Sequence, residues 1–185
     1  YLLQHAIDHS AERFPDKEAF RCYDQGLTYA ELVRWANALA QMLQEQGVRR
    51  RDRVGICLNK SLKSAVAIYG IMKAGAAYVP LDPLAPISRL AFVLKDCGIG
   101  HLISEDSMRG KLGALAQEGV ILDSVVGLSG QGDLPFREIT WADIEAMPGA
   151  SPPQSVLMEH DLAYIMYTSG STGTPKGLMH THHSG

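Results

Sequence analysis

Cysteine is scarce in this chain, and its three cysteines fit neither a metal site nor a disulfide framework. Cys22, Cys57 and Cys97 lie far apart and form no C-x-x-C pair, which excludes the spacings typical of zinc sites and of disulfide-rich secreted domains. Cys57 and Cys97 lie in or beside apolar stretches, where a small buried thiol is the ordinary role. Unpaired cysteines fit a reducing compartment, and we therefore expect a cytoplasmic protein.

Long apolar runs and a large charge excess of one sign are also absent. No apolar stretch reaches the roughly 20 residues of a membrane-spanning helix, and the residues from Tyr1 onward do not resemble a signal peptide. The 17 Lys and Arg against 20 Asp and Glu give a net charge of −3, which argues against nucleic-acid and membrane-surface partners. The basic run at 49–51 has no interleaved aromatic residue, and we expect it to be a solvated turn.

What the sequence does contain, from about Thr28 onward, is an alternation of helix and strand patterns. Thr28 and Glu31 have the spacing of a capping box, and apolar residues then recur at helical spacing until Gly47. Short apolar strands are expected in RVGICL, AYVPL, IGHLIS and VILDSVVG, with helices between them. Repeated strand–helix–strand units predict an α/β fold with a mostly parallel sheet flanked by helices.

Two polar stretches interrupt this alternation before the last strand pattern. Residues 127–135 are glycine-rich and are expected to form a loop. TWADIEAM, with capping-box spacing from Thr140 to Asp143, is expected to form a short helix. PGASPPQS cannot continue that helix because prolines remove backbone N–H donors. We expect a surface connection here rather than a domain boundary, since the strand that follows should rejoin the sheet.

The last strand pattern, LAYIMY at 162–167, is followed by a segment that can bury almost nothing. Residues 168–177 read TSGSTGTPKG and hold five hydroxyl side chains, three glycines and Lys176. Glycines allow successive backbone N–H groups to point into one concavity that favours anions. Hydroxyl groups add short-range donors, and a lysine adds a point charge of the kind that often contacts phosphate. The composition therefore indicates a polyphosphate ligand.

Composition alone leaves other interpretations open. A Ser/Gly-rich linker without a ligand has similar content. A Walker A loop requires glycine before its lysine and Ser or Thr after it, whereas Pro175 and Gly177 flank Lys176, so a P-loop ATPase is disfavoured. The H-x-H-H pattern at 180–183 has no acidic or cysteine partner close by in the sequence, and we expect ordinary strand or loop there rather than a metal site.

The order T-S-G-S-T-G-T-P-K-G resembles the signature of the adenylate-forming (AMP-binding) superfamily. Its members are acyl-CoA synthetases, luciferase-like ligases and the adenylation domains of nonribosomal peptide synthetases. Two further segments, LTYAEL at 27–32 and IMKAGAAYVPLDP at 71–83, resemble earlier motifs of the family in the same order. The resemblance thus covers nearly the whole chain. One departure is Arg51, where the family often has glycine.

This resemblance implies an AMP-forming acid–thiol ligase. In the family, the carboxylate of a fatty, aryl or amino acid attacks the α-phosphate of ATP, which binds with Mg²⁺, and gives an acyl-adenylate and pyrophosphate. A thiol, from CoA or from the phosphopantetheine arm of a carrier protein, then accepts the acyl group. KAGAAYVPLDP favours the amino-acid-activating branch, whereas KGLMHTHHSG suits an acyl-activating ligase equally well. The acid and the acceptor therefore stay open.

The resemblance also assigns roles within residues 168–177. Lys176 would neutralise the β- and γ-phosphates, and Thr168 would in addition be a ligand of Mg²⁺. Pro175 and Gly177 would shape the loop. The residues implied to surround the phosphates are Thr168, Ser169, Gly170, Ser171, Thr172, Gly173, Thr174 and Lys176.

The family's later elements, including its adenine and ribose sites and its catalytic lysine, would follow Gly185. The chain also has no initiator methionine. We therefore expect residues 1–185 to form a partial N-terminal subdomain of an AMP-binding domain, inactive by itself, with a phosphate-binding loop at 168–177. The alternative is a short non-catalytic protein that binds a nucleotide or pyrophosphate, or that only binds a partner.

Overall fold

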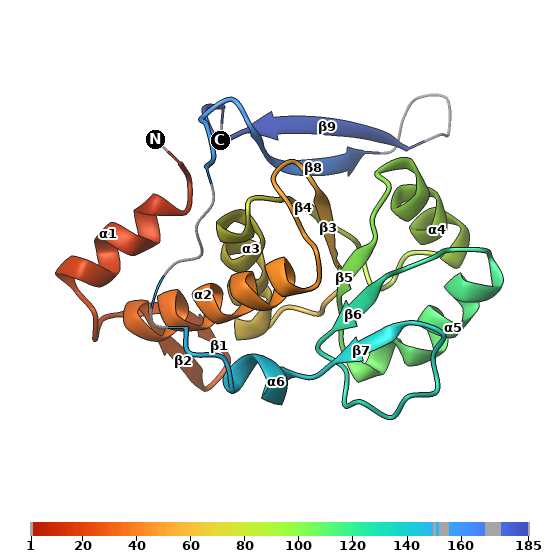
Figure 1. Ribbon diagram of the computed structural model, residues 1–185, viewed down its shortest axis with the longest axis horizontal. Helices are drawn as coiled ribbons and strands as arrows, with labels where there is room; N and C mark the ends of the chain where they lie inside the picture. Colours follow the sequence, from red (N-terminus) through yellow and green to blue (C-terminus); the bar gives the residue numbers. More distant parts are fainter. Residues whose placement is uncertain (1, 150, 152–155, 169–174, 185) are drawn as a thin grey trace.

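The computed structural model describes residues 2–149, 151, 156–168 and 175–184. Its centre is a seven-stranded sheet, with helices packed around it (Figure 1). The strands are, in spatial order, β7 (Arg137–Ile139), β6 (Ser124–Val126), β5 (His101–Ile103), β3 (Arg53–Ile56), β4 (Ala77–Pro80), β8 (Leu162–Thr168) and β9 (Lys176–Thr181).

The sheet is mostly parallel, as the sequence predicted. Each pair of neighbours from β7 to β8 is parallel, and β9 alone runs antiparallel, beside β8. The strand that follows the proline-rich connection does rejoin the sheet, because β8 pairs with β4. The α/β fold class is therefore confirmed, and the hairpin of β8 and β9 forms one edge of the sheet (Figure 1).

The core has two layers, one on each face of the sheet. Ile103 and Val126 are buried together with side chains of α2 (Tyr29–Glu45) and α3 (Leu62–Ala74). Leu102 and Val125 are instead buried with side chains of α4 (Ile87–Asp96) and α5 (Arg109–Gln117). Successive side chains of a strand point to opposite faces, so the two pairs of helices cover opposite sides of the sheet.

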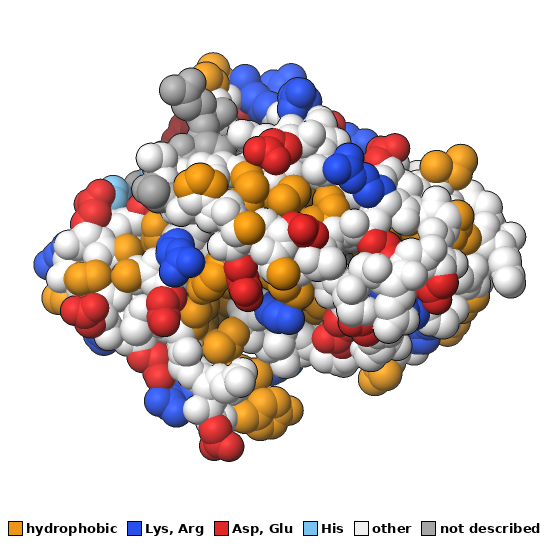
Figure 2. Space-filling model, turned by 60° about the horizontal axis from the view of Figure 1, so that its bottom comes forward, with side chains coloured by type: hydrophobic (Ala, Val, Ile, Leu, Met, Phe, Trp, Pro, Cys, Tyr) orange, Lys and Arg blue, Asp and Glu red, His pale blue; other side chains and the backbone are white. Residues whose placement is uncertain are grey.

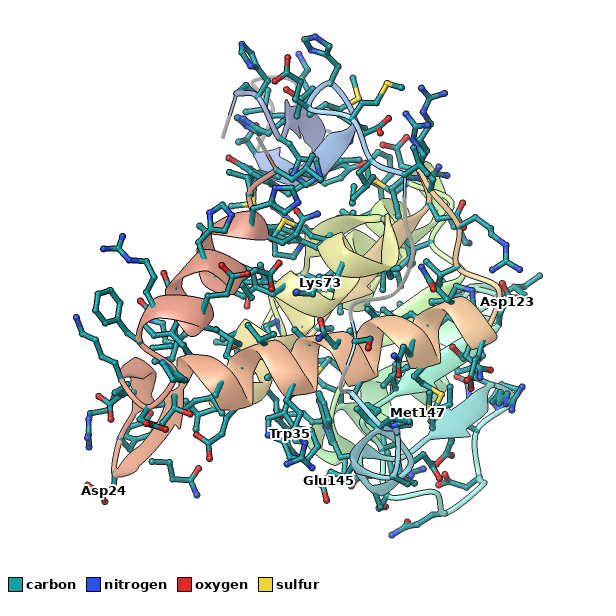
Figure 3. The ribbon with its side chains drawn as sticks, turned by 60° about the vertical axis from the view of Figure 1, so that its left-hand side comes forward. Asp24, Trp35, Lys73, Asp123, Glu145 and Met147 are labelled. Atoms are coloured by element: carbon teal, nitrogen blue, oxygen red, sulfur yellow. The ribbon has the colours of Figure 1, made fainter. Side chains whose placement is uncertain are left out.

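Several short elements were not predicted. The chain begins with α1 (His5–Arg13) and a hairpin of β1 (Glu18–Cys22) and β2 (Gln25–Thr28), and η1 (Asp106–Met108) and α6 (Trp141–Glu145) complete the elements. Of these, α6 was expected from TWADIEAM, and η1 leads into α5, the helix expected between IGHLIS and VILDSVVG. The ammonium of Lys73, on α3, forms an ion pair with Asp8 of α1. Lys73 points toward α1 in Figure 3 and is only 3% exposed, so this pair joins the N-terminal helix to the body of the fold.

The surface carries no extended field of one charge on the face drawn in Figure 2. Blue and red side chains are interspersed over most of it, with a group of blue side chains at the upper edge and orange hydrophobic side chains between them. This mixture agrees with the nearly balanced composition. Among the described residues, none of the helices combines the length and the apolar character that a membrane crossing would need.

Both predicted capping boxes are present. At the start of α2, the Glu31 N–H donates to Thr28 Oγ1 at 3.2 Å and the Thr28 N–H donates to Glu31 Oε2 at 2.8 Å. Thr140 and Asp143 make the same two bonds at the start of α6. These bonds satisfy N–H groups that have no partner within the helix.

Replacing Thr28 with alanine is expected to lower the free energy of unfolding by about 1 kcal/mol, because one backbone N–H of α2 loses its acceptor. Urea denaturation followed by circular dichroism measures this change. The control is Glu45→Ala, at an exposed position in the last turn of the same helix, which should change stability by less than about 0.5 kcal/mol. Equal effects of the two substitutions would show that the cap is not important.

Candidate phosphate-binding site

The β8–β9 hairpin carries the two described ends of the predicted phosphate loop. Thr168 is the last residue of β8 and Lys176 the first of β9, and the register of the hairpin places them directly opposite each other. Residues 169–174 lie outside the described residues, and so do the predicted contacts of Ser169, Gly170, Ser171, Thr172, Gly173 and Thr174. The structure thus shows the two strand ends on either side of residues 169–174, with Thr168 and Lys176 opposite each other in the register.

Thr168 and Lys176 belong to the same face of the hairpin. Directly opposed residues of antiparallel strands project to the same side, and both side chains are exposed. The Lys176 side chain makes no hydrogen bond or ion pair with any of the residues that the structure describes.

Stacked rings brace this face further along the strands. Tyr78 of β4 stacks on Tyr164 of β8 with ring centroids 5.2 Å apart, and Tyr164 stacks on His180 of β9 at 4.5 Å. The three rings cross three adjacent strands, so they fix the hairpin laterally against the sheet. His180 thus has a packing role, and the described residues contain no group of three His, Cys, Asp or Glu side chains that could hold a metal ion.

On the opposite face, Tyr167 fastens the end of β8 to α4. Its hydroxyl donates to the Asp96 carboxylate and lies 3.2 Å from Cys97 Sγ. Burial, together with the bond to Asp96, raises the pKa of Tyr167, so the phenol stays protonated. A Cβ at Gly177 would lie 3.2 Å from Tyr167 Cζ and 3.1 Å from Ile165 Cγ2. Glycine therefore lets the ring lie close against β9, which agrees with a shape role for Gly177.

A cavity opens beside this hairpin at the carboxyl ends of β4 and β8. Its volume is about 330 Å³, and its lining includes Leu81, Asp82, Arg89, Met166 and Tyr167. In open parallel sheets, ligands bind outside the carboxyl ends of the strands. The cavity thus lies where such a fold accommodates a ligand, next to the end of β8 that leads into the loop.

At the other end of the hairpin, Asp161 is buried in a set of hydrogen bonds that the sequence did not predict. Arg50 donates to its carboxylate from Nε at 2.8 Å and from a terminal nitrogen at 3.1 Å, and Arg51 donates from Nε at 3.2 Å. The Met158 N–H adds a fourth bond at 2.8 Å. We call these four residues the Asp161 cluster. The guanidinium of Arg50 is the main cause that lowers the pKa of Asp161 to about 2.

The Asp161 cluster corrects one prediction. The run at 49–51 is not simply a solvated turn, since Arg50 and Arg51 both bind Asp161. The sequence did not reveal this contact because the partners are about 110 residues apart in the chain, and no local sequence pattern relates residues so far apart.

His182 directly follows β9 and links the ends of the two hairpin strands. Its backbone N–H donates to the Asp161 carbonyl oxygen at 3.1 Å, and its ring Nδ1 accepts a hydrogen bond from the Leu3 N–H at 3.3 Å. Burial lowers the pKa of His182, so the ring is neutral and can act as an acceptor. Leu3, the start of β8 and the end of β9 therefore meet at one point.

Comparison with known proteins gives the same assignment over nearly the whole chain. The family model described as "AMP-binding enzyme" matches residues 7–184. Tyrocidine synthase 3 of Brevibacillus parabrevis is 38% identical over 182 residues, which are 97% of this chain and 2% of that protein. Malpinin synthetase of Mortierella alpina is 38% identical over 181 residues, again 97% of this chain and 2% of that protein. The chain thus spans a small part of the length of these curated relatives.

Two of the similar solved structures illustrate the match, and each is similar over 98% of the chain. The nonribosomal peptide synthetase FmoA3, in its alpha-methyl-L-serine-AMP bound form, has a TM-score of 0.78 at 33% identity, and the match covers 18% of it. VinN in complex with L-aspartate has a TM-score of 0.80 at 27% identity, and the match covers 44% of it. With a family model that matches almost all of its residues and a fold shared with these proteins, this chain belongs to the AMP-binding enzyme family.

Proposed function

We propose that this chain supplies the phosphate-binding part of an AMP-forming ligase that activates a carboxylic acid with ATP. The observation that carries the proposal is the hairpin register, which sets the exposed Thr168 hydroxyl opposite the exposed Lys176 ammonium at the two ends of a Ser/Thr/Gly-rich segment. Hydroxyl donors and a lysine around a glycine-rich turn suit a polyphosphate. In this proposal, residues 1–185 form the N-terminal part of a larger adenylation domain.

The proposed reaction assigns each group a task. A carboxylate oxygen of the substrate forms a bond to the α-phosphorus of ATP, the bond from that phosphorus to the β-phosphate bridging oxygen breaks, and pyrophosphate leaves. Lys176 and the segment from Thr168 to Thr174 hold the β- and γ-phosphates and stabilise the charge that develops on the leaving group. When Mg²⁺ is bound, it neutralises phosphate charge.

Thr168 suits a Mg²⁺ ion only as one ligand among several. Mg²⁺ takes oxygen ligands and commonly binds through one or two protein groups together with substrate phosphates and water. The described residues hold no cluster of three acidic or histidine ligands. The Thr168 hydroxyl, exposed at the end of β8, therefore fits a metal ion that arrives with ATP better than one held permanently by this part of the chain.

An amino acid is the substrate class that we favour, with a carrier-protein phosphopantetheine thiol as acceptor and CoA as the alternative. The similarity to a nonribosomal peptide synthetase at 33% identity supports this choice. Two of the similar solved structures, FmoA3 and VinN, bind an amino acid or its adenylate, which supports the same choice. A cytoplasmic location stays a prediction, and the buried free thiols of Cys57 and Cys97 support it.

The test is ATP–pyrophosphate exchange by the complete protein with a panel of amino, aryl and fatty acids. Exchange that depends on one amino acid, and that is at least tenfold slower with aryl and fatty acids, is the expected result. Exchange with a fatty or aryl acid would support the proposed ligase activity but contradict an amino acid as the substrate. Binding of pyrophosphate without exchange for any acid would instead favour a non-catalytic nucleotide-binding protein.

A further inference from the structure

We propose that the ion pair between Arg50 and Asp161 is a positioning element that orients the β8–β9 hairpin and, with it, the phosphate-binding segment. The inference rests on the function proposed above. Neither residue contacts the substrate in this proposal. Both act through the two strands that join the Asp161 cluster to Thr168 and Lys176.

The geometry of the pair suits a positioning role. The Asp161 side chain is 4% exposed and that of Arg50 is 33% exposed, and Arg50 donates two hydrogen bonds to the carboxylate. Such a two-point contact fixes both the distance and the orientation of the partners. The side chain of Arg51 is 75% exposed and makes a single, longer bond at 3.2 Å. Arg50 is therefore the principal partner.

The pair also lies at a suitable place in the chain. Arg50 belongs to the turn that precedes β3, a strand at the centre of the sheet. Asp161 immediately precedes β8, and its carbonyl oxygen accepts the N–H of His182, which immediately follows β9. The pair thus ties the base of both hairpin strands to the middle of the fold.

The hairpin itself has a short attachment to the sheet. The ladder between β8 and β4 is registered at Tyr78 and Tyr164, whereas the ladder between β8 and β9 runs from Leu162 to Thr168. The stacked rings of Tyr78, Tyr164 and His180 hold the middle of the hairpin, and the bond from Tyr167 to Asp96 holds its loop end. The ion pair between Arg50 and Asp161 is the attachment at its base. From its base to Thr168 the hairpin spans roughly 20 Å, at about 3.3 Å per residue. A shift at the base changes the path of both strands and therefore the positions of Thr168 and Lys176 at their other end. A displacement of about 1 Å is on the order of what impairs catalysis.

The experiment compares Arg50→Ala, Arg50→Lys and Asp161→Asn in the complete enzyme with the matched control Arg49→Ala. Arg49 lies in the same run and loses the same charge, but its guanidinium donates to the carbonyl oxygens of Gln44 and Val48 and not to Asp161. The KM for ATP, the KM for the carboxylic acid and kcat are measured by ATP–pyrophosphate exchange. The Tm of each variant is recorded as well.

We expect Arg50→Ala and Asp161→Asn each to raise the KM for ATP about tenfold, with the KM for the acid changed less than twofold. Arg50→Lys keeps the positive charge but cannot donate the two guanidinium hydrogen bonds, and its KM for ATP should lie between those of Arg50→Ala and the wild type. The double variant Arg50→Ala/Asp161→Asn should have a KM for ATP no higher than that of either single variant, because the two residues act as one unit. Arg49→Ala should leave both KM values unchanged.

A purely structural role gives a different result. Arg50→Ala would then lower Tm and the amount of active enzyme, with the KM for ATP within twofold of the wild type, and this would overturn the proposal. Amide hydrogen exchange supplies a readout that does not need activity. The exchange rates of Arg50→Ala are compared with those of the wild type. A larger increase in β8 and β9 than in β5 and β6 supports the positioning role, and an equal increase in all four strands contradicts it. Absence of ATP–pyrophosphate exchange in the wild type would reject the proposed function itself. Amide hydrogen exchange does not depend on activity, so failure of the positioning role and failure of the proposed function give different results.

Discussion

Replacing Lys176 with alanine is expected to lower kcat/KM for ATP about 100-fold in the complete enzyme, the loss typical of removing one group that stabilises developing charge. The ammonium lies at the start of β9, exposed and opposite Thr168, where it would face the β- and γ-phosphates. Without it, the charge on departing pyrophosphate is balanced less well. ATP–pyrophosphate exchange at saturating acid measures the change.

Two further variants make the Lys176 result specific. Lys176→Arg keeps the charge with a different shape, and we expect it to retain more activity than the alanine variant. Lys17→Ala, in the exposed turn between α1 and β1, removes the same charge far along the chain and should change kcat/KM less than twofold. If Lys176→Ala and Lys17→Ala behaved alike, the role given to Lys176 would be wrong.

Replacing Gly127 with alanine is expected to lower the free energy of unfolding by about 3 kcal/mol, a large loss for the addition of one methyl group. Gly127 directly follows β6 and has a φ of +105°, where side chains are strained. A Cβ there would lie 2.4 Å from the Ser104 carbonyl oxygen and 2.9 Å from Trp141 Nε1. The backbone of a buried turn would have to move to make room.

Gly132→Ala is the matched control for Gly127→Ala. Gly132 has a φ of +70° in the same connection, but nothing lies within 4 Å of the position of its Cβ. The control therefore keeps the conformational cost, about 1 kcal/mol, and removes the clash. Chemical denaturation of both variants separates the two contributions, and equal losses would show that the contact with Ser104 is unimportant.

The regular part of the fold was predictable because local signals mark its boundaries. Thr28 with Glu31 and Thr140 with Asp143 start helices in the sequence and in the structure. The apolar strands between them are buried and parallel. The predicted strand VILDSVVG is shorter than expected, since β6 covers only Ser124–Val126.

The elements that escaped prediction have weak local patterns. The strand β1 has mostly exposed residues and lies in a two-stranded sheet outside the main one, so it shows no run of apolar side chains. The strand β7 has three residues, of which Arg137 is exposed and Ile139 buried. Such strands form because a neighbouring strand offers hydrogen bonds, and that neighbour is not evident from the residues themselves.

Part of the candidate site was likewise predictable from the sequence, and part is visible only in the structure. The segment 168–177 was identified from its composition and order, and the register of Thr168 with Lys176 follows once β8 and β9 are antiparallel neighbours. The contact of Arg50 with Asp161 could not be foreseen, because the topology alone brings the two residues together. Arg51 illustrates the same limit: its φ of +73° accounts for the glycine that the family often has there, and its contact with Asp161 is visible only in the structure.

A crystal structure of the complete protein with a non-hydrolysable ATP analogue and Mg²⁺ would show directly whether residues 168–177 hold the β- and γ-phosphates of ATP. We predict that the terminal phosphates lie within hydrogen-bonding distance of Lys176 Nζ and of the Thr168 hydroxyl or its bound metal ion, at the mouth of the β8–β9 hairpin. An analogue bound elsewhere, with its phosphates away from both residues, would contradict this assignment.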